Sequence, residues 1–343
     1  MQNCFLVLAN GCVFEGQRFG ADKHADGELV FTTSSSHMSA LTDPCYAGQI
    51  VLHTSPLIGN YGVVSSEMDA DHCSLNGYIV KEWCDYPVNF QSEGDIDSFL
   101  KEHDIAGVCG VDTRQITRIL RNEGTMRAAI ADAVTPELIA QLNEPLPPVT
   151  VKPAERALYP ADNSNGKLVL IDCGAVHGAI AALNGRGYDV CVLPNTASID
   201  QVMNEKPKAV LISDGPGDPS LADAKLIALI QAIKLPMLGL GYGHLLIAGA
   251  HGAPIRKLHH GHRGVNQPIQ RTADSQVFIC SLNQGYATDV PENAKVSFRN
   301  VNDGSVAGLV YDNALSVQFV PDPTLGPLRT DFIYDEWLGK VVD

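Results

Sequence analysis

The 343-residue sequence is short of basic residues and of long apolar runs. It has 24 Lys and Arg residues against 39 Asp and Glu residues, which gives a formal net charge of -15 at pH 7. This balance argues against a nucleic-acid or anionic-membrane partner, because both are held by clusters of positive charge. No stretch approaches the roughly 20 apolar residues that a membrane-spanning helix needs, and the opening residues lack the basic region of a signal peptide. We therefore expect a cytoplasmic protein.

Paired cysteines are also missing. None of the nine cysteines belongs to a Cys-x-x-Cys pair, which argues against a structural zinc site. In a reducing compartment we expect free thiols that serve as small apolar side chains. His259, His260 and His262 are close in sequence, but we interpret them as loop histidines, since adjacent histidines in a turn point in different directions. The sequence therefore predicts no metal site and no cofactor.

The chain is long enough for two domains, and its pattern changes near the middle. A stretch rich in proline and polar residues covers residues 145–166. Such a composition is typical of turns and linkers. We therefore expect an N-terminal domain at residues 1–150, a linker at 151–166 and a C-terminal domain at 167–343.

Strands and helices are mixed in the N-terminal domain. Residues 27–33 and 49–54 have the apolar and β-branched composition of strands. Residues 112–122 predict an amphipathic helix, because Ile116 and Leu120 fall on one face of it.

In the C-terminal domain, apolar runs alternate with helical segments. The runs cover residues 167–172, 188–194, 209–213 and 236–240. This alternation is typical of a parallel sheet with right-handed crossovers, so the fold class is α/β. Ligands of such sheets bind at the carboxyl ends of the strands, where Asp172, Gly215 and Gly241 fall.

A glycine-rich turn follows the fourth apolar run. Residues 236–244 predict a strand, a tight turn and a helix, which is the arrangement of a nucleophile elbow. In such an elbow, a strained turn residue presents its side chain above the sheet. Gly241 stands at this turn and has no side chain with which to attack. The preceding turn at residues 213–219 has two glycines around a proline, so its N–H groups can face a common anion or oxyanion.

Together these stretches resemble the small, glutamine-hydrolysing subunit of carbamoyl phosphate synthetase, whose second domain is a class I glutamine amidotransferase. The resemblance covers nearly the whole chain, and it implies an N-terminal mixed α/β domain specific to this subunit and a C-terminal parallel-sheet amidotransferase domain. Other class I amidotransferases lack the first domain, so its motifs are specific. The matching motifs stand at residues 41–44, 58–62, 110–121, 213–219, 239–244, 261–266 and 283–285.

The catalytic triad that the resemblance implies is missing. The family elbow reads G-I-C-L-G-H-Q and residues 239–245 read G-L-G-Y-G-H-L, so the nucleophilic cysteine corresponds to Gly241. The family's H-P-E, which supplies the base and its orienting carboxylate, corresponds to Val320, Pro321 and Asp322. A cysteine nucleophile needs a thiolate activated by a neighbouring imidazole, and Val320 cannot exchange a proton. We therefore expect no glutaminase activity.

The resemblance also implies a substrate pocket, and its positions have changed as well. The family's glutamine-contacting Gln corresponds to Leu245, and its N-H-G has become N-Q-G, from Asn283 to Gly285. A T-G-Y-Q-E segment, expected after the strand that ends at Ser34, is shortened to residues 36–39. Because polar groups have been replaced by apolar ones, we expect a pocket that is smaller or more apolar than the family's.

Gly215 and Tyr242 correspond to the oxyanion-binding positions, and no residue close to them is a convincing replacement nucleophile. Tyr242 is a poor one, because the unperturbed pKa of tyrosine is about 10. Cys173 ends the first apolar run, and we interpret it as a small packed residue. No candidate pairs a nucleophile with a base.

These features leave two functions open and disfavour a third. The first is a non-hydrolysing small subunit that docks on a carbamoyl phosphate synthetase large subunit. It would support the ammonia-dependent synthesis of carbamoyl phosphate, a precursor of pyrimidines and arginine. The large subunit would carry the ATP chemistry, since this chain has no P-loop motif. The alternative is a stand-alone regulatory protein with a small-molecule ligand in the altered pocket, because a fold does not determine a function. An active glutaminase with relocated residues is disfavoured by the triad losses.

Overall fold

The computed structural model describes residues 2–70, 72–149, 154–176, 178–321 and 328–342. The chain forms two units, Met1–Val149 and Thr150–Asp343, which are described separately. Among the described helices, none is long and apolar enough to cross a membrane.

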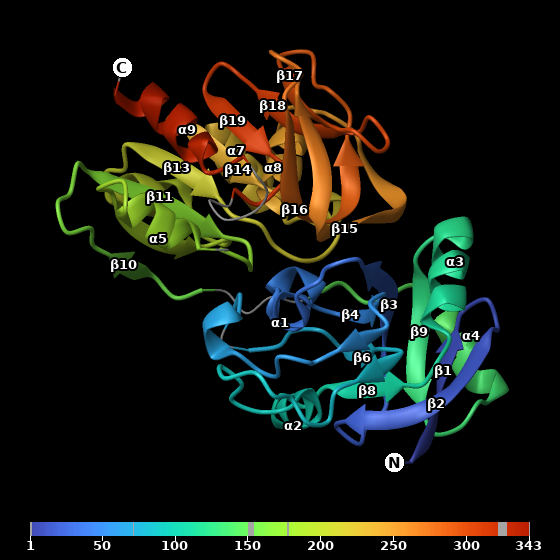
Figure 1. Ribbon diagram of the computed structural model, residues 1–343. Coiled ribbons are helices and arrows are strands. Elements are labelled where there is room, and N and C mark those ends of the chain that lie inside the picture. Colours follow the sequence, from blue (N-terminus) through green and yellow to red (C-terminus); the bar gives the residue numbers. More distant parts are fainter. Residues whose placement is uncertain (1, 71, 150–153, 177, 322–327, 343) are drawn as a thin grey trace. The chain divides into compact units, whose positions relative to one another are not determined.

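The first unit is built around a closed barrel with the strand order β1-β2-β8-β6-β4-β3-β9 (Figure 1). Its β3-β4, β4-β6 and β6-β8 pairs are parallel and the others are antiparallel. The predicted strands at 27–33 and 49–54 correspond to β3 and β4. The barrel strands are β1 (Asn3–Leu8), β2 (Val13–Gly20), β3 (Ala25–Thr32), β4 (Gln49–His53), β6 (Gly77–Ile79), β8 (Ala106–Cys109) and β9 (Met126–Ala131).

Helices and a small second sheet complete this unit. Apolar side chains alternate along β3, so Leu29 packs in a cluster with Leu120, whereas Val30 packs in another with Met38. The α-helices and further strands described in this unit are α1 (His37–Thr42), α2 (Ile96–Glu102), α3 (Thr113–Glu123), α4 (Pro136–Leu142) and the paired short strands β5 (Leu57–Ile58) and β7 (Glu82–Trp83).

Helix α3 confirms the helix expected at 112–122. Its N-cap is Asp112, whose side chain accepts a hydrogen bond from the Gln115 N–H (2.9 Å). Its C-cap is Gly124, whose φ of 91° suits glycine. The apolar face is buried through Ile116 and Leu120, which leaves the polar face exposed.

The second unit contains a ten-stranded sheet in the order β10-β12-β11-β13-β14-β19-β18-β17-β15-β16. Its parallel part is β12-β11-β13-β14-β19, which includes the four strands expected from the apolar runs. The strands are β10 (Ala157–Tyr159), β11 (Lys167–Asp172), β12 (Asp189–Pro194), β13 (Ala209–Ile212), β14 (Met237–Leu240), β15 (Ile255–Arg271), β16 (Val277–Thr288), β17 (Lys295–Asn300), β18 (Val306–Val310) and β19 (Ala314–Val317).

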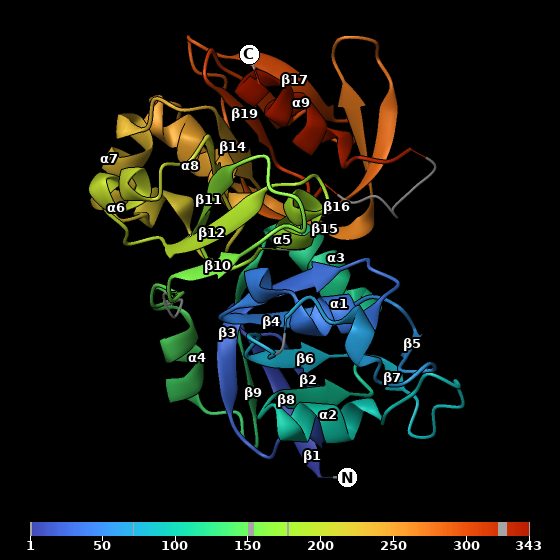
Figure 2. The ribbon, with the colours of Figure 1, turned by 90° about the vertical axis from the view of Figure 1, so that its left-hand side faces the viewer.

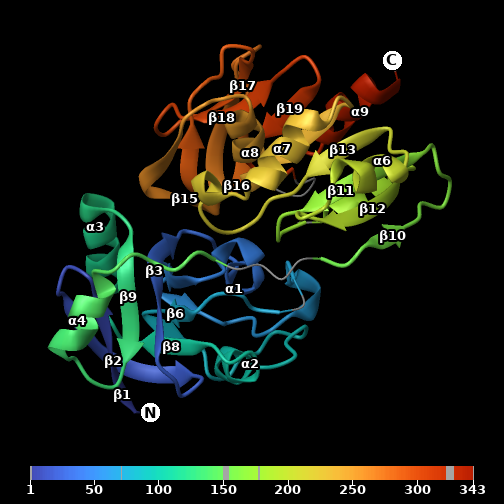
Figure 3. The ribbon, with the colours of Figure 1, turned by 180° about the vertical axis from the view of Figure 1, so that it is seen from behind.

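Helices cover both faces of the parallel part, as its continuous apolar runs require. Along β11, Leu170 belongs to the core beneath α5 and α9, and Ile171 belongs to the core beneath α6, α7 and α8. Figures 1 and 2 show α5 and α9, and Figure 3, the view from behind, shows α6, α7 and α8. These helices are α5 (Ala179–Asn184), α6 (Ile199–Asn204), α7 (Ala224–Ala232), α8 (Tyr242–Ala250) and α9 (Phe332–Val342).

The interpretation of the three histidines as loop residues was wrong. His259, His260 and His262 lie within the long strand β15, which pairs with β16. The Nε2 atom of His262 is 2.8 Å from a carboxylate oxygen of Asp303. Among the described residues, no group of three or more His, Cys, Asp or Glu side chains could hold a metal ion.

Candidate functional site

The elbow that the sequence predicts is present between β14 and α8. Strand β14 ends at Leu240, helix α8 begins at Tyr242, and Gly241 joins them with φ 51° and ψ -108°. The Gly241 N–H donates to the carbonyl of Val317 in the neighbouring parallel strand (2.9 Å). This backbone conformation costs a residue with a side chain about 1–3 kcal/mol, but glycine adopts it freely. The tight turn between strand and helix is therefore present, and it carries a glycine.

The two N–H groups expected to bind an oxyanion bind a carboxylate of the chain itself. The Gly215 N–H donates to the Oδ1 atom of Asp214 (2.8 Å), and the Tyr242 N–H donates to the same atom (2.7 Å). Asp214 is buried. A negative charge is favourable here, because Tyr242 is the first residue of helix α8 and the N-terminus of a helix attracts anions. Asp214 thus accepts hydrogen bonds from the two N–H groups that the sequence predicts for an oxyanion.

Asp214 also fills the space that a nucleophilic side chain would need. A Cβ atom at position 241 would lie 2.1 Å from the Cγ of Asp214 and 2.2 Å from each carboxylate oxygen. Such distances are far below van der Waals contact. A cysteine at position 241 and the observed Asp214 side chain therefore exclude one another.

The loop that carries Asp214 is fixed to the end of β11. The Ala175 N–H donates to the Asp214 carbonyl (3.0 Å), and the Cys173 N–H donates to the hydroxyl oxygen of Ser213 (2.9 Å). A Cβ atom on Gly215 would lie 2.3 Å from the Cys173 carbonyl oxygen, so this close approach requires glycine. These contacts hold the Asp214 backbone close to the elbow.

Neither residue considered as a replacement nucleophile is activated. Cys173 is buried, and this burial raises the pKa of its thiol. Burial also raises the pKa of the Tyr242 hydroxyl. Both groups are therefore protonated at neutral pH, and neither is a nucleophile in that form.

His244 is the histidine nearest in sequence to the elbow, and it is fully buried in α8. Burial lowers its pKa to about 3, so its ring is neutral. Its Nδ1 atom is 2.8 Å from the hydroxyl oxygen of Ser316, and its Nε2 atom has no hydrogen-bond partner among the described residues. His244 is therefore a packed residue of the helix.

The expected base position holds no ionisable group. Val320 is partly buried, and its N–H donates to the carbonyl of Ser281 in β16 (3.3 Å). Asp322, the carboxylate equivalent, lies outside the described residues. Val320 lies after the end of β19, and an isolated β-bridge pairs it with Ser281 of β16.

The residues expected to line a substrate pocket are described here within the unit to which each belongs. Leu245 is buried in α8, and Asn283 and Gly285 lie in β16, where Asn283 pairs with Arg263 of β15. Ser34 belongs to the first unit, where it is buried and its hydroxyl donates to the Ser36 carbonyl (3.1 Å).

The residue that sequence reasoning missed is Asp214. It stands directly before a Gly-Pro-Gly turn, and an acidic residue beside an expected anion cradle is a signal for an internal ligand. The sequence does not show that its side chain turns back onto the N–H groups.

Comparisons with known proteins agree with this architecture. Residues 6–130 match the family Carbamoyl-phosphate synthase small chain, CPSase domain, and residues 169–339 match Glutamine amidotransferase class-I. The chain is 38% identical to the carbamoyl phosphate synthase small chain of Bacillus thuringiensis subsp. konkukian, with 98% of this chain and 95% of that protein covered. It is 36% identical to the protein of the same name from Streptococcus agalactiae serotype III, with 98% of each chain covered. The chain therefore belongs to the family of carbamoyl phosphate synthase small chains.

Proposed function

We propose that this chain is a small subunit that does not hydrolyse glutamine and that associates with a carbamoyl phosphate synthetase large subunit supplied directly with ammonia. The observation that carries the proposal is the Asp214 carboxylate, which accepts from the N–H groups of Gly215 and Tyr242 and fills the space beside Gly241. Amide hydrolysis by this fold needs a nucleophile, a base and free oxyanion donors. The nucleophile and base positions hold Gly241 and Val320, and the donors are engaged.

The partner in this proposal follows from the family. Carbamoyl phosphate synthase small chains normally pair with a large subunit, and the domain specific to them is matched at residues 6–130. A subunit that provides no ammonia can still stabilise its partner, because binding to the folded state shifts its stability by mass action. We propose that the complex works in the cytoplasm and makes carbamoyl phosphate for pyrimidine or arginine synthesis.

The test is an assay of the purified chain with and without the large subunit of the same organism. We expect glutamate release from L-glutamine at the background rate in both cases, and carbamoyl phosphate synthesis from ammonia by the complex. A small chain with an intact Cys-His-Glu triad is the positive control. Glutamine turnover comparable to that of the control would contradict the proposal, and failure to associate would favour a stand-alone protein.

A further inference from the structure

Three arginines form a row on the exposed side of helix α3. Arg114, Arg118 and Arg121 are spaced at i, i+4 and i+7, so they share one face of the helix and span about 10 Å along its axis. All three are exposed, and the buried face through Ile116 and Leu120 points away from them. We call this row the arginine face. It is a local concentration of positive charge on a chain whose net charge is -15.

The positive charges of the arginine face have no acidic partner in the part of the chain that the structure describes. Over the residues that the structure describes, Arg114, Arg118 and Arg121 form no hydrogen bond or ion pair. The neighbouring carboxylates are engaged elsewhere, since Asp112 caps the helix and Glu123 accepts from the Nδ2 of Asn10 (2.8 Å). The other arginines of this unit differ, because Arg18 is paired with Asp132 and Arg127 with Asp26.

The position of Arg114 does not serve the stability of the helix. It is the second residue of α3, and the first turn contains no acidic residue. Backbone N–H groups give the N-terminus of a helix a partial positive charge, so a cation there is unfavourable. The electrostatics of the helix therefore do not account for an arginine at this position.

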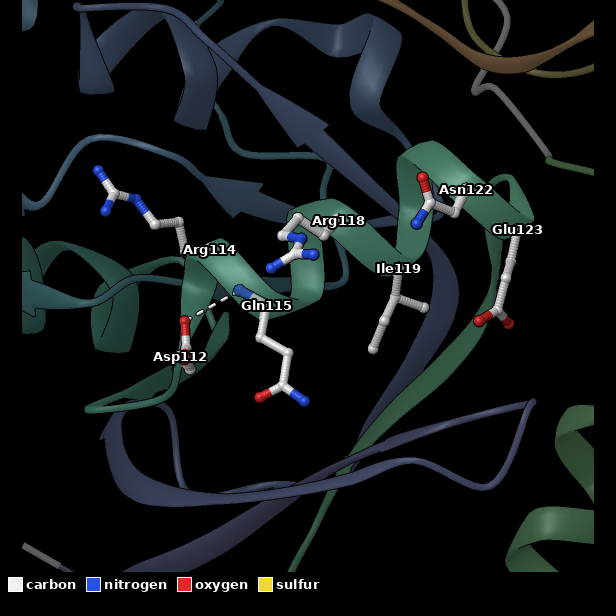
Figure 4. Close-up of a pocket in the computed structure, with 7 residues that line it drawn as sticks. All are labelled: Asp112, Arg114, Gln115, Arg118, Ile119, Asn122 and Glu123. Carbon is white, nitrogen blue, oxygen red and sulfur yellow. Dashed lines mark hydrogen bonds between the residues drawn. The ribbon is translucent and has the colours of Figure 1, made fainter.

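A surface cavity of about 520 Å³ lies along the same helix. Figure 4 shows Arg114, Gln115, Arg118 and Asn122 among the side chains that line it. Two guanidinium groups and two amides supply hydrogen-bond donors for carboxylate oxygens. Asp112 and Glu123 also line the cavity, and both accept the hydrogen bonds described above. A guanidinium group can bind a carboxylate through two parallel hydrogen bonds, which gives geometric specificity as well as charge.

We propose that the arginine face is the docking surface for an acidic segment of the carbamoyl phosphate synthetase large subunit. This inference rests on the proposed function, because it identifies where the partner binds. An acidic protein segment fits better than a nucleic acid, since the rest of this chain is strongly acidic and would repel a polyanion of that length. A short acidic segment contacts only the arginine face.

The experiment measures binding of the purified chain to the purified large subunit by surface plasmon resonance at 50 mM and 300 mM NaCl. The test variant is Arg114→Glu/Arg118→Glu/Arg121→Glu, and a milder variant carries Gln at the same positions. The matched control is Lys81→Glu/Lys225→Glu/Lys295→Glu, which makes the same change in net charge at exposed lysines. Circular dichroism and thermal unfolding establish that each variant is folded.

We expect the Glu variant to bind at least about a hundredfold more weakly than the unchanged chain, and the lysine control to bind within about threefold of it. The affinity of the Gln variant for the large subunit lies between those of the Glu variant and the lysine control, and it loses most of its dependence on salt concentration. Equal binding by the unchanged chain and the Glu variant overturns the docking inference and leaves the proposed function standing. Equal weakening in the lysine control also overturns it. If the unchanged chain does not bind, the proposed function itself fails.

Discussion

The elbow of the second unit and the arginine face of the first unit handle charge in opposite ways. At the elbow, a buried carboxylate meets two N–H donors of the same chain, so the site is satisfied internally. On α3, three guanidinium groups stand exposed without a partner among the described residues. A satisfied polar site resists a new ligand, because the ligand must displace an existing hydrogen bond. The exposed guanidinium groups of α3 can bind another molecule without breaking a hydrogen bond within the described part of the protein. We therefore expect substitutions at the elbow to change stability strongly and substitutions on α3 to change it little.

We expect the largest change in the free energy of unfolding from Gly241→Cys. The new Cβ would meet the Asp214 carboxylate at 2.1 Å, and the backbone conformation adds strain. We expect the free energy of unfolding to fall by about 3 kcal/mol or more, as measured by urea denaturation, and no glutamine hydrolysis to appear. The double variant Gly241→Cys/Asp214→Gly should be less destabilised than the sum of the single changes, and simple additivity would contradict the steric exclusion.

Restoration of activity needs more than the cysteine. The best candidate combines Gly241→Cys, Asp214→Gly, Val320→His, Asp322→Glu and Leu245→Gln, which supplies the nucleophile, its space, a base, a carboxylate and an amide contact. Glutamate release is the readout. Glutamine turnover by Gly241→Cys alone would show that a residue other than the one at position 320 acts as the base.

A smaller effect is expected from Asp214→Ala. This change leaves the Gly215 and Tyr242 N–H groups without their acceptor, so the free energy of unfolding should fall by about 1–3 kcal/mol. Asp214→Asn is the matched control, because its amide oxygen can still accept both hydrogen bonds. Denaturation curves that place the Asn variant below the Ala variant would argue against the internal anion role.

The pH dependence of stability gives a third, smaller test at α8. Burial lowers the pKa of His244 to about 3 from its ordinary value of 6.5, so the unfolded chain takes up a proton at this histidine before the folded chain does as the pH falls. The stabilisation is complete above pH 6.5 and is lost progressively as the pH falls toward 3. His244 should contribute about 1 kcal/mol to the loss of stability between pH 7.5 and 5.5. A His244→Gln variant with an unchanged pH profile would contradict this.

The smallest effect concerns the arginine face in the free protein. Because these side chains are exposed and unpartnered, Arg114→Gln should change the free energy of unfolding by less than about 0.5 kcal/mol. Arg114→Glu should be neutral or slightly stabilising, since an acidic residue suits the first turn of a helix. Thermal unfolding of the isolated chain is the measurement. A clear loss of stability would mean that Arg114 serves the fold rather than a partner.

The sequence was sufficient for local features with a strong pattern. The parallel strands, the elbow at Gly241 and the helix at 112–122 were predicted because each has an apolar run, a glycine turn or an amphipathic repeat. Strand β15 was not predicted, since its basic and histidine-rich sequence lacks alternation and its pairing with β16 has register shifts. Barrel closure was also missed, because it depends on pairing between β1 and β9, which are far apart in the chain. The role of Asp214 could not be predicted, because it depends on the direction in which its side chain turns.

The mutual exclusion of Asp214 and a side chain at position 241 has an evolutionary consequence. With Asp214 in place, a single change of Gly241 to cysteine produces a steric clash. A single change of Asp214 leaves the Gly215 and Tyr242 N–H groups without this acceptor. Because each substitution alone is unfavourable, a sequence with a cysteine at position 241 has to change both positions together.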